Sequence, residues 1–301
     1  MANNIKLTFL GTAASIPTAS RNHTSILLTY QGENILVDCG EGTQRQFRKA
    51  NLNPCKITRM LITHWHGDHV LGVPGLLQTL ALSGYNKTIY LYGPKGTKDF
   101  LNKITAIFAF VDKLNIEVKE VKDGKFFESE DFYLEAKPMT HWTHTNAYCF
   151  VKKGERRIDK IKLKKSKLPS GPLLQQLKEG KDITFNGKKF LSKNLTYKDE
   201  DRKVSIVLDT SMNERIVPFV KNSDLLILDS SFGSDMEEKA KEHMHMTSKQ
   251  TAEIAKKSKS KKLVLVHVSP RYERDINVVL NDAKKVFKNS VLVNDLDVIE
   301  I

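Results

Sequence analysis

Residues 64–69 place four side chains of metal-ligand type within six positions: His64, His66, Asp68 and His69. They follow the apolar run 60–62, which predicts a short buried strand. In α/β sheets, ligands bind in the loops that leave the carboxyl ends of the strands. Imidazole nitrogens and carboxylate oxygens are ligands that zinc accepts. One short segment cannot wrap four such groups around one tetrahedral ion without strain, so we predict two neighbouring ions rather than a purely structural cluster.

Other predicted strands also end in residues of ligand type. Asp209 and His267 each follow a short apolar run directly, and His141 comes shortly after a longer, apolar-leaning segment. By spacing alone, His144 fits this position as well as His141 does. With the four residues above, these positions give seven candidate ligands. Two ions bridged by one carboxylate need about that number while leaving room for water.

The elements that must position these residues alternate between strand-like and helix-like segments, which predicts an α/β fold with two face-to-face sheets and helices outside. We find no linker, so we expect one domain over residues 1–301. The expected strands are 5–10, 25–30, 34–38, 57–62, 88–92, 147–151, 205–208, 225–228 and 263–266, with two or three more between 116 and 134. The expected helices are 41–49, 70–82, 95–108, 248–257 and 275–286.

The charge is unevenly distributed. The chain has a net charge of +13, and residues 152–167 hold nine lysines and arginines against two acidic residues. This predicts a polyanionic partner, nucleic acid rather than an anionic membrane surface, although a lysine-rich or salt-adapted surface is the alternative. Residues 152–197 have weak periodicity and a Pro-Ser-Gly-Pro run at 169–172. We therefore expect a basic inserted arm at roughly 152–197, either functional or disordered.

Several classes of protein are disfavoured. No run of about 18 apolar residues is present, so we expect no membrane span and no membrane partner. The first five residues lack the apolar stretch of a signal peptide. The three cysteines are odd in number and widely spaced, which favours unpaired thiols and a cytoplasmic location. Cys39 and Cys149 are expected to fill the core.

The sequence resembles the metallo-β-lactamase superfamily, whose signature matches Thr63–His69, and within it the tRNase Z family. The resemblance covers nearly the whole chain and includes Phe9–Thr12, Pro17–Thr18, Asp38–Gln46, Val73–Leu77, Val207–Thr210, His245–Thr247, His267–Tyr272 and Pro169–Pro172. The family spacing to Tyr148 favours His141 over His144. Three departures from the family pattern are Trp65, Met246 and the run 228–231, where Leu-Asp-Ser-Ser replaces His-Glu-Ala-Thr.

This resemblance implies an αββα sandwich of two mixed sheets and a zinc-dependent endoribonuclease that removes the 3′ trailer of precursor tRNA. Attack by metal-bound hydroxide would leave a 3′ hydroxyl on the tRNA and a 5′ phosphate on the trailer. Two Zn²⁺ ions are implied per subunit, with Mn²⁺ or another divalent ion as the alternative, and family members usually form homodimers. The resemblance assigns His64, His66 and His141 to one ion, Asp68, His69 and His267 to the other, and Asp209 to both.

Further roles are implied for individual residues. Asp68 is the general base, and His245 protonates or stabilises the departing 3′ oxygen. The expected substrate-binding residues are Arg271, Arg21, Thr18, Lys160, Lys162, Lys164 and Lys165. Two other hypotheses compete with this one: a small-molecule hydrolase of the same fold, and a non-catalytic nucleic-acid-binding protein. The basic arm argues against the first, and the complete ligand set argues against the second because unmetallated polar clusters are costly to bury.

Overall fold

The computed structural model describes residues 4–108 and 114–301 and divides into two compact units. Unit 1 comprises the described residues up to 127 together with 134–150 and 203–301, and unit 2 comprises 128–133 and 151–202. Residues 1–3, on which the expectation of no signal peptide partly rests, lie outside the described residues. Within the described ranges, no helix is long and apolar enough to cross a membrane.

The first sheet has the order β18-β1-β2-β3-β4-β5-β6. Its pairs are antiparallel from β18 to β3 and parallel from β3 to β6. The apolar residues of β3 to β5 share one core with those of α1 and α3. The strands are β1 (Lys6–Gly11), β2 (Ser25–Tyr30), β3 (Glu33–Val37), β4 (Arg59–Leu61), β5 (Thr88–Gly93), β6 (Asn115–Glu120) and β18 (Val298–Glu300). The helices are α1 (Thr43–Lys49), η1 (Pro54–Lys56), α2 (Gly67–Val70), α3 (Val73–Leu82) and α4 (Thr97–Ala106).

The second sheet has the order β17-β16-β15-β14-β9-β8-β7 and is parallel from β14 to β17. A second core joins β15 and β16 to α10 and α11. The strands are β7 (Gly124–Glu128), β8 (Phe132–Met139), β9 (Thr145–Lys152), β14 (Arg202–Val207), β15 (Leu225–Asp229), β16 (Leu263–Val266) and β17 (Ser290–Leu292). The helices are α8 (Ile216–Phe219), η2 (Ser234–Met236), α9 (Glu237–Glu242), α10 (Ser248–Lys257), η3 (Pro270–Tyr272) and α11 (Asn277–Val286).

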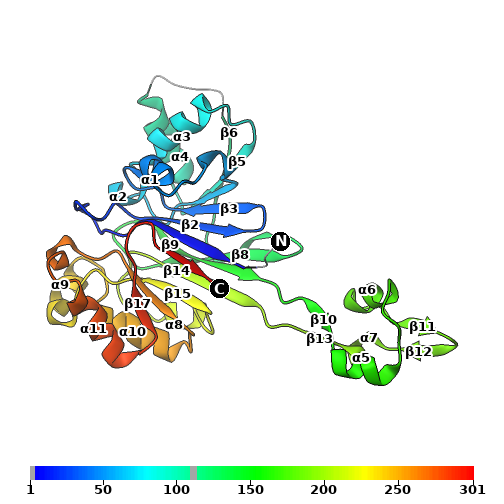
Figure 1. Ribbon diagram of the computed structural model, residues 1–301. Helices are drawn as coiled ribbons and strands as arrows, with labels where there is room; N and C mark the ends of the chain where they lie inside the picture. Colours follow the sequence, from blue (N-terminus) through cyan, green and yellow to red (C-terminus); the bar gives the residue numbers. More distant parts are fainter. Residues whose placement is uncertain (1–3, 109–113) are drawn as a thin grey trace. The chain divides into compact units, whose positions relative to one another are not determined.

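The layers follow from these two cores. Figure 1 shows α1, α3 and α4 beside the first sheet and α8, α10 and α11 beside the second, with the two sheets between them. The expected αββα sandwich is therefore confirmed. Cys39 and Cys149 are buried, as expected, and burial raises the pKa of the Cys39 thiol to about 12.

The prediction of one helix over 70–82 is wrong, because the helix is interrupted at Leu71–Gly72 and α3 begins at Val73. A Cβ atom on Gly72 would lie 2.0 Å from the carbonyl oxygen of Gly40. The Gly72 N–H also donates to the Cys39 carbonyl at 2.9 Å. The loop after β3 therefore packs against the turn between α2 and α3, which holds the C-terminal end of the His-rich segment in place.

Unit 2 contains the basic arm, which the sequence predicts to be either functional or disordered, and it forms its own secondary structure. Its elements are β10 (Arg156–Ile158), α5 (Lys160–Ser166), α6 (Leu173–Lys178), β11 (Ile183–Phe185), β12 (Lys188–Phe190), α7 (Ser192–Leu195) and β13 (Thr196–Lys198). A small apolar cluster that includes Leu168, Leu177 and Phe190 lies among them. Sequence periodicity missed this unit because its helices and strands span only three to seven residues, too few for either period to emerge.

Candidate active site

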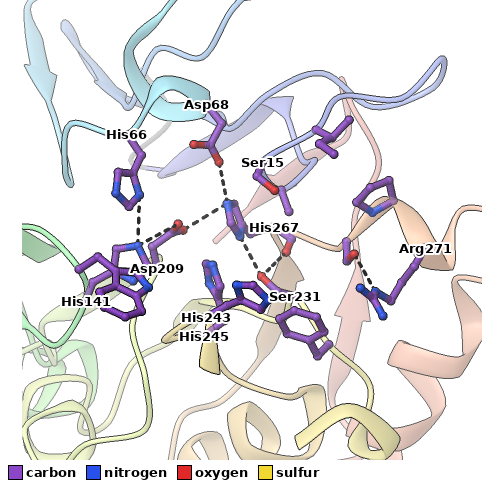
Figure 2. A pocket seen from close by; sticks show the side chains of 16 residues that line it. Ser15, His66, Asp68, His141, Asp209, Ser231, His243, His245, His267 and Arg271 are labelled. Carbon is purple, nitrogen blue, oxygen red and sulfur yellow. Dashed lines mark hydrogen bonds and ion pairs between the residues drawn. The ribbon is translucent and has the colours of Figure 1, made fainter. Parts of the chain in front are cut away.

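Unit 1 brings the seven predicted ligands together although they come from distant stretches of the chain. Figure 2 shows five of them: His66, Asp68, His141, Asp209 and His267. Each lies at or shortly after the carboxyl end of a strand, or in α2, as the strand-end rule predicts. Two groups of four residues have ligand atoms within 4.8 Å of one another: His64, His66, His141 and Asp209, and Asp68, His69, Asp209 and His267. His141 is in the cluster, whereas His144 is exposed and outside it.

Asp209 belongs to both groups, and its two oxygens face different ones. Its Oδ2 lies 3.5 Å from His64 Nε2 and 3.9 Å from His141 Nε2. Its Oδ1 lies 3.3 Å from His69 Nε2 and 3.2 Å from His267 Nε2. This is the arrangement that a carboxylate bridging two cations requires.

Four of the five clustered imidazoles are held through Nδ1 and turn Nε2 toward the centre. Nδ1 of His69 donates to Asp38 at 2.6 Å, and Nδ1 of His141 donates to the Met244 carbonyl at 3.2 Å. Nδ1 of His64 and of His267 donate to hydroxyl oxygens at 3.1 and 3.0 Å. With the Nδ1 hydrogen committed, each Nε2 keeps its lone pair free for a metal.

The two hydroxyls are relays to buried carboxylates. Thr63 Oγ1 accepts from His64 and donates to Asp38 at 2.7 Å. Ser231 Oγ accepts from His267 and donates to Asp229 at 2.6 Å. Sequence reasoning missed Asp38, Thr63 and Ser231 as site residues. The sequence signals for Asp38 were its place as the last residue of the predicted strand 34–38 and the start of the family match Asp38–Gln46.

The backbone is strained at the carboxylates and imidazole that follow strands. Asp38, Asp209 and His267 have positive φ angles of 56°, 39° and 58°. Left-handed backbone costs residues other than glycine of the order of 1 kcal/mol each, and such strain gathers where a site fixes its geometry. The turn at each strand end therefore aims the side chain into the cluster instead of along the sheet.

Burial and charge act in opposite directions on the imidazoles. Burial lowers the pKa of His64 well below its ordinary value and that of His141 to about 4, so both rings stay neutral. Burial also opposes the charged form of His69, but nearby carboxylates, Asp209 first, outweigh it and raise its pKa. The neutral rings of His64 and His141 do not compensate the negative charge of the carboxylates beside them. A divalent cation would compensate that charge.

The donor set fits a divalent metal. Among the described residues, two buried atoms in the cluster lack a hydrogen-bond partner: His64 Nε2 and Asp209 Oδ1. His69 Nε2 and His267 Nε2 lie 3.3 Å apart and both face Asp209 Oδ1, so three atoms of ligand type share one space. Buried lone pairs without a partner cost free energy, and a bound cation would remove that cost.

His245 lies beside the cluster and is held by a different carboxylate, Asp229. Its Nδ1 donates to Asp229 Oδ2 at 2.8 Å, and its ring centroid is 5.3 Å from that of His141. Burial opposes charging of the ring, but Asp229 and Asp209 outweigh it and raise the pKa of His245. Asp229, whose role the departure from the family pattern left open, thus positions both His245 and, through Ser231, His267.

With this geometry established, similarity to known proteins decides the family. The chain is 38% identical to the Ribonuclease Z of Nanoarchaeum equitans over 97% of its own length and 92% of that protein. The chain belongs to the ribonuclease Z family. It is also similar to the structure of human tRNase Z, short form, with 27% identity, a TM-score of 0.72 and 98% of both chains covered.

This ribonuclease Z family member has two further similarities, one to a solved structure and one to a second family model. A metallo-β-lactamase fold protein of Bacillus subtilis, YhfI, superposes with a TM-score of 0.73 at 18% identity over 99% of this chain and 100% of that one. Residues 5–158 match the family model described as Anti-Pycsar protein Apyc1, so this part of the chain belongs to that family as well. That match ends before Asp209, the residue that joins the two ligand groups.

Of the predicted substrate-binding residues of this family member, one lines the pocket and four lie on the basic arm. Arg271 lines the pocket over the cluster, and its guanidinium carbon lies 5.3 Å from the ring centroid of Phe232. Its Nε donates to Ser269 Oγ at 3.2 Å, and the side chain is exposed. Four other predicted substrate-binding residues lie on α5 of unit 2. All four are exposed to solvent: Lys160, Lys162, Lys164 and Lys165.

Arg21 and Thr18 serve the fold instead. Arg21 is buried, and its guanidinium donates to Thr12 Oγ1, the Val293 carbonyl and Asn294 Oδ1 at 2.6, 2.8 and 2.7 Å. Thr18 Oγ1 accepts the backbone N–H of Arg21 at 3.1 Å and closes the turn between them. Because these groups are committed inside the protein, the structure gives no support to their predicted contact with substrate.

Proposed function

We propose that this protein is a metal-dependent endoribonuclease that removes the 3′ trailer from precursor tRNA. One observation carries the proposal: Asp209 lies between two groups of ligand atoms and turns one oxygen toward each. The family supports the substrate class, because a full-length relative is named Ribonuclease Z and a similar structure is named tRNase Z. The basic α5 supports a polyanionic substrate.

We propose two zinc ions per subunit, with manganese or another divalent ion as the alternative. His64, His66 and His141 would hold one, Asp68, His69 and His267 the other, and Asp209 both. Such ions, when bound, lower the pKa of a coordinated water to about 7 and neutralise charge on a phosphate.

The chain's own residues would supply the proton transfers. Asp68 lines the pocket, with its Oδ2 held 3.3 Å from His267 Nε2, and would take the proton of the attacking water. As the oxygen of that water bonds to phosphorus, the bond from phosphorus to the 3′ oxygen breaks. His245, fixed by Asp229, would give its proton to that oxygen. Arg271 would bind the phosphate through its planar guanidinium. The products are a tRNA with a 3′ hydroxyl and a trailer with a 5′ phosphate.

A cleavage assay on one precursor tRNA tests this proposal, with the cut mapped and the new ends identified. We expect the wild-type protein to cut at the trailer junction and His66→Ala to lose both metal and activity. His245→Ala should lower the rate by roughly 10²- to 10⁴-fold while keeping its metal content, because the residue transfers a proton. His144→Ala, which removes an exposed imidazole outside the cluster, is the matched control and should behave as wild type.

Two results would contradict the mechanism. A product ending in a 2′,3′-cyclic phosphate would mean that the ribose itself attacks, not water. A His245→Ala variant that loses metal would assign this residue to the ligand group formed by Asp209, Asp229, His245 and His267, whose ligand atoms also lie within 4.8 Å.

We also propose a homodimer that works in the cytoplasm, where an enzyme of precursor tRNA would meet its substrate. The dimer proposal is supported by exposed apolar side chains of unit 1 near α3. Leu71 and Leu82 are 54% and 81% exposed at the two ends of α3, and Phe108 lines a groove with Leu71. Light scattering on the wild type and on a Leu71→Asp, Leu82→Asp double variant tests it, since a monomeric wild type would refute it.

A further inference from the structure

Trp142 is the large aromatic residue that the mechanism above does not use. Its side chain is 66% exposed, yet it lines the same pocket as His66, Asp68 and Asp209. An indole buries up to about 250 Å² when covered, so leaving most of one in water forgoes a large stabilisation. Because this exposed indole lines the pocket, a ligand bound there would cover it.

The backbone that leads into Trp142 is anchored. The Thr140 N–H donates to Thr210 Oγ1 at 3.1 Å, and the Thr140 carbonyl accepts from the Ser211 N–H at 3.0 Å. The next residue, His141, is tied through Nδ1 to the Met244 carbonyl at 3.2 Å. The indole is therefore presented from a fixed backbone, so little conformational entropy is lost when a ligand covers it.

The pocket extends past the cluster in two directions, and different residues lie at its two ends. Figure 2 shows His141, which precedes Trp142, at one end and Arg271 at the other, with Asp209 and His267 between them. Arg271 lies over the ring of Phe232 and offers a cation to a phosphate. The cavity measures about 400 Å³, at the small end of the range of ligand pockets. This volume suits a phosphodiester with one adjoining nucleoside.

We propose that Trp142 is a stacking platform for a nucleobase that flanks the scissile phosphate. The inference rests on the proposed function, which places an RNA strand across the cluster. Proteins that bind single-stranded RNA stack unpaired bases on aromatic rings, and this contact tolerates any base because every base has a flat face. Trp142 would hold the strand end in register over Asp68 and His245 without reading its sequence.

The test measures kcat/KM of metal-loaded wild type, Trp142→Ala, Trp142→Leu and Trp142→Phe on a precursor tRNA. We expect Trp142→Ala and Trp142→Leu to lose roughly 5- to 150-fold, the range for one stacked base. Trp142→Phe should retain most of the activity, because leucine keeps apolar bulk but only phenylalanine keeps a flat ring. Metal content and melting temperature should match wild type in all three variants.

Two further substrates identify the base, one abasic at the last retained nucleotide and one abasic at the first trailer nucleotide. On one of them the penalty of Trp142→Ala should disappear, because no base remains to stack. A penalty that persists on both abasic substrates, equal activity of Trp142→Ala and wild type, or a change in oligomeric mass instead of rate would each overturn the proposal. If the wild type itself does not cleave precursor tRNA, the proposed function fails first, and the two failures are thereby distinguished.

Discussion

Two buried carboxylates hold four imidazoles of the site by the same arrangement. Asp38 accepts directly from His69 and, through Thr63, orients His64. Asp229 accepts directly from His245 and, through Ser231, orients His267. In each case a hydroxyl donates its hydrogen to the carboxylate, so that it can only accept from the ring. The tautomer of each ring is thus set by a residue that does not itself reach the substrate.

Asp38→Asn tests this arrangement at a single residue. The Asp38 carboxylate accepts from Thr63 N, Thr63 Oγ1 and His69 Nδ1, whereas an amide has one oxygen and its NH₂ would face a donor. We expect zinc affinity to fall roughly 10- to 100-fold and the free energy of unfolding to fall by about 1–3 kcal/mol. A competition titration with a zinc chelator measures the first, and urea unfolding measures the second.

The control for this prediction is Asp99→Asn, which changes an exposed carboxylate paired with Lys103 on α4. Surface pairs of this kind contribute little, so both quantities should stay near wild type. Zinc affinity in Asp38→Asn equal to that of wild type would show that the ring of His69 is oriented by packing alone.

At the level of elements, the contact of the β3 loop with the turn before α3 sets the position of the His-rich segment. The Cys39 N–H donates to the His69 carbonyl at 2.8 Å, and its carbonyl accepts from Gly72 at 2.9 Å. Gly40 is packed as closely, since a Cβ there would lie 2.5 Å from the Asp68 carbonyl oxygen. The backbones can approach this closely because Gly40 and Gly72, which lie at the contact, carry no Cβ atom.

Gly72→Ala tests that contact. Its φ of −80° suits alanine, so any loss comes from the added methyl group, which would lie 2.0 Å from the Gly40 oxygen. We expect a lower urea midpoint, equivalent to roughly 1–3 kcal/mol, together with weaker metal binding as the loops separate. Gly32→Ala is the matched control because a Cβ there has nothing within 4 Å. Equal midpoints for the two variants would refute the role of this contact.

Sequence patterns could predict the elements that end in the site but not the packing between them. Apolar runs followed by Asp209 and His267 identified two ligands, because a strand end and a ligand type coincide there. Ser231 carries no such signal, since its role depends on a relay between residues 229 and 267 that only the folded chain creates. The break at Gly72 was missed for the same reason, as it depends on contact with Gly40.

At the scale of the whole molecule, the candidate metal site and the basic arm belong to different compact units. Each unit has its own apolar cluster, so a change of surface charge on α5 need not disturb the ligands in unit 1. Part of the arm's charge is already paired, since Lys153 contacts Glu128, Arg157 contacts Asp199 and Lys162 of α5 contacts Asp159. The four lysines of α5 are the cations that we expect to meet phosphates.

Neutralising those four lysines to glutamine should therefore separate binding from chemistry. Lysines that neutralise phosphates displace counterions, so precursor tRNA affinity should fall, and the slope of its logarithm against log salt should become shallower by about 0.7–0.9 for each phosphate left without a lysine. Hydrolysis of bis(p-nitrophenyl) phosphate, which carries a single phosphate and no RNA strand for the lysines to bind, should continue at the wild-type rate. The control changes four exposed lysines of unit 1, Lys249, Lys256, Lys284 and Lys221, and alters net charge equally. If the control variant weakens tRNA binding as much, the effect is one of overall charge and the arm is not a dedicated binding surface. If the arm variant loses tRNA cleavage and phosphodiester hydrolysis alike, binding and chemistry are not separable between the two units.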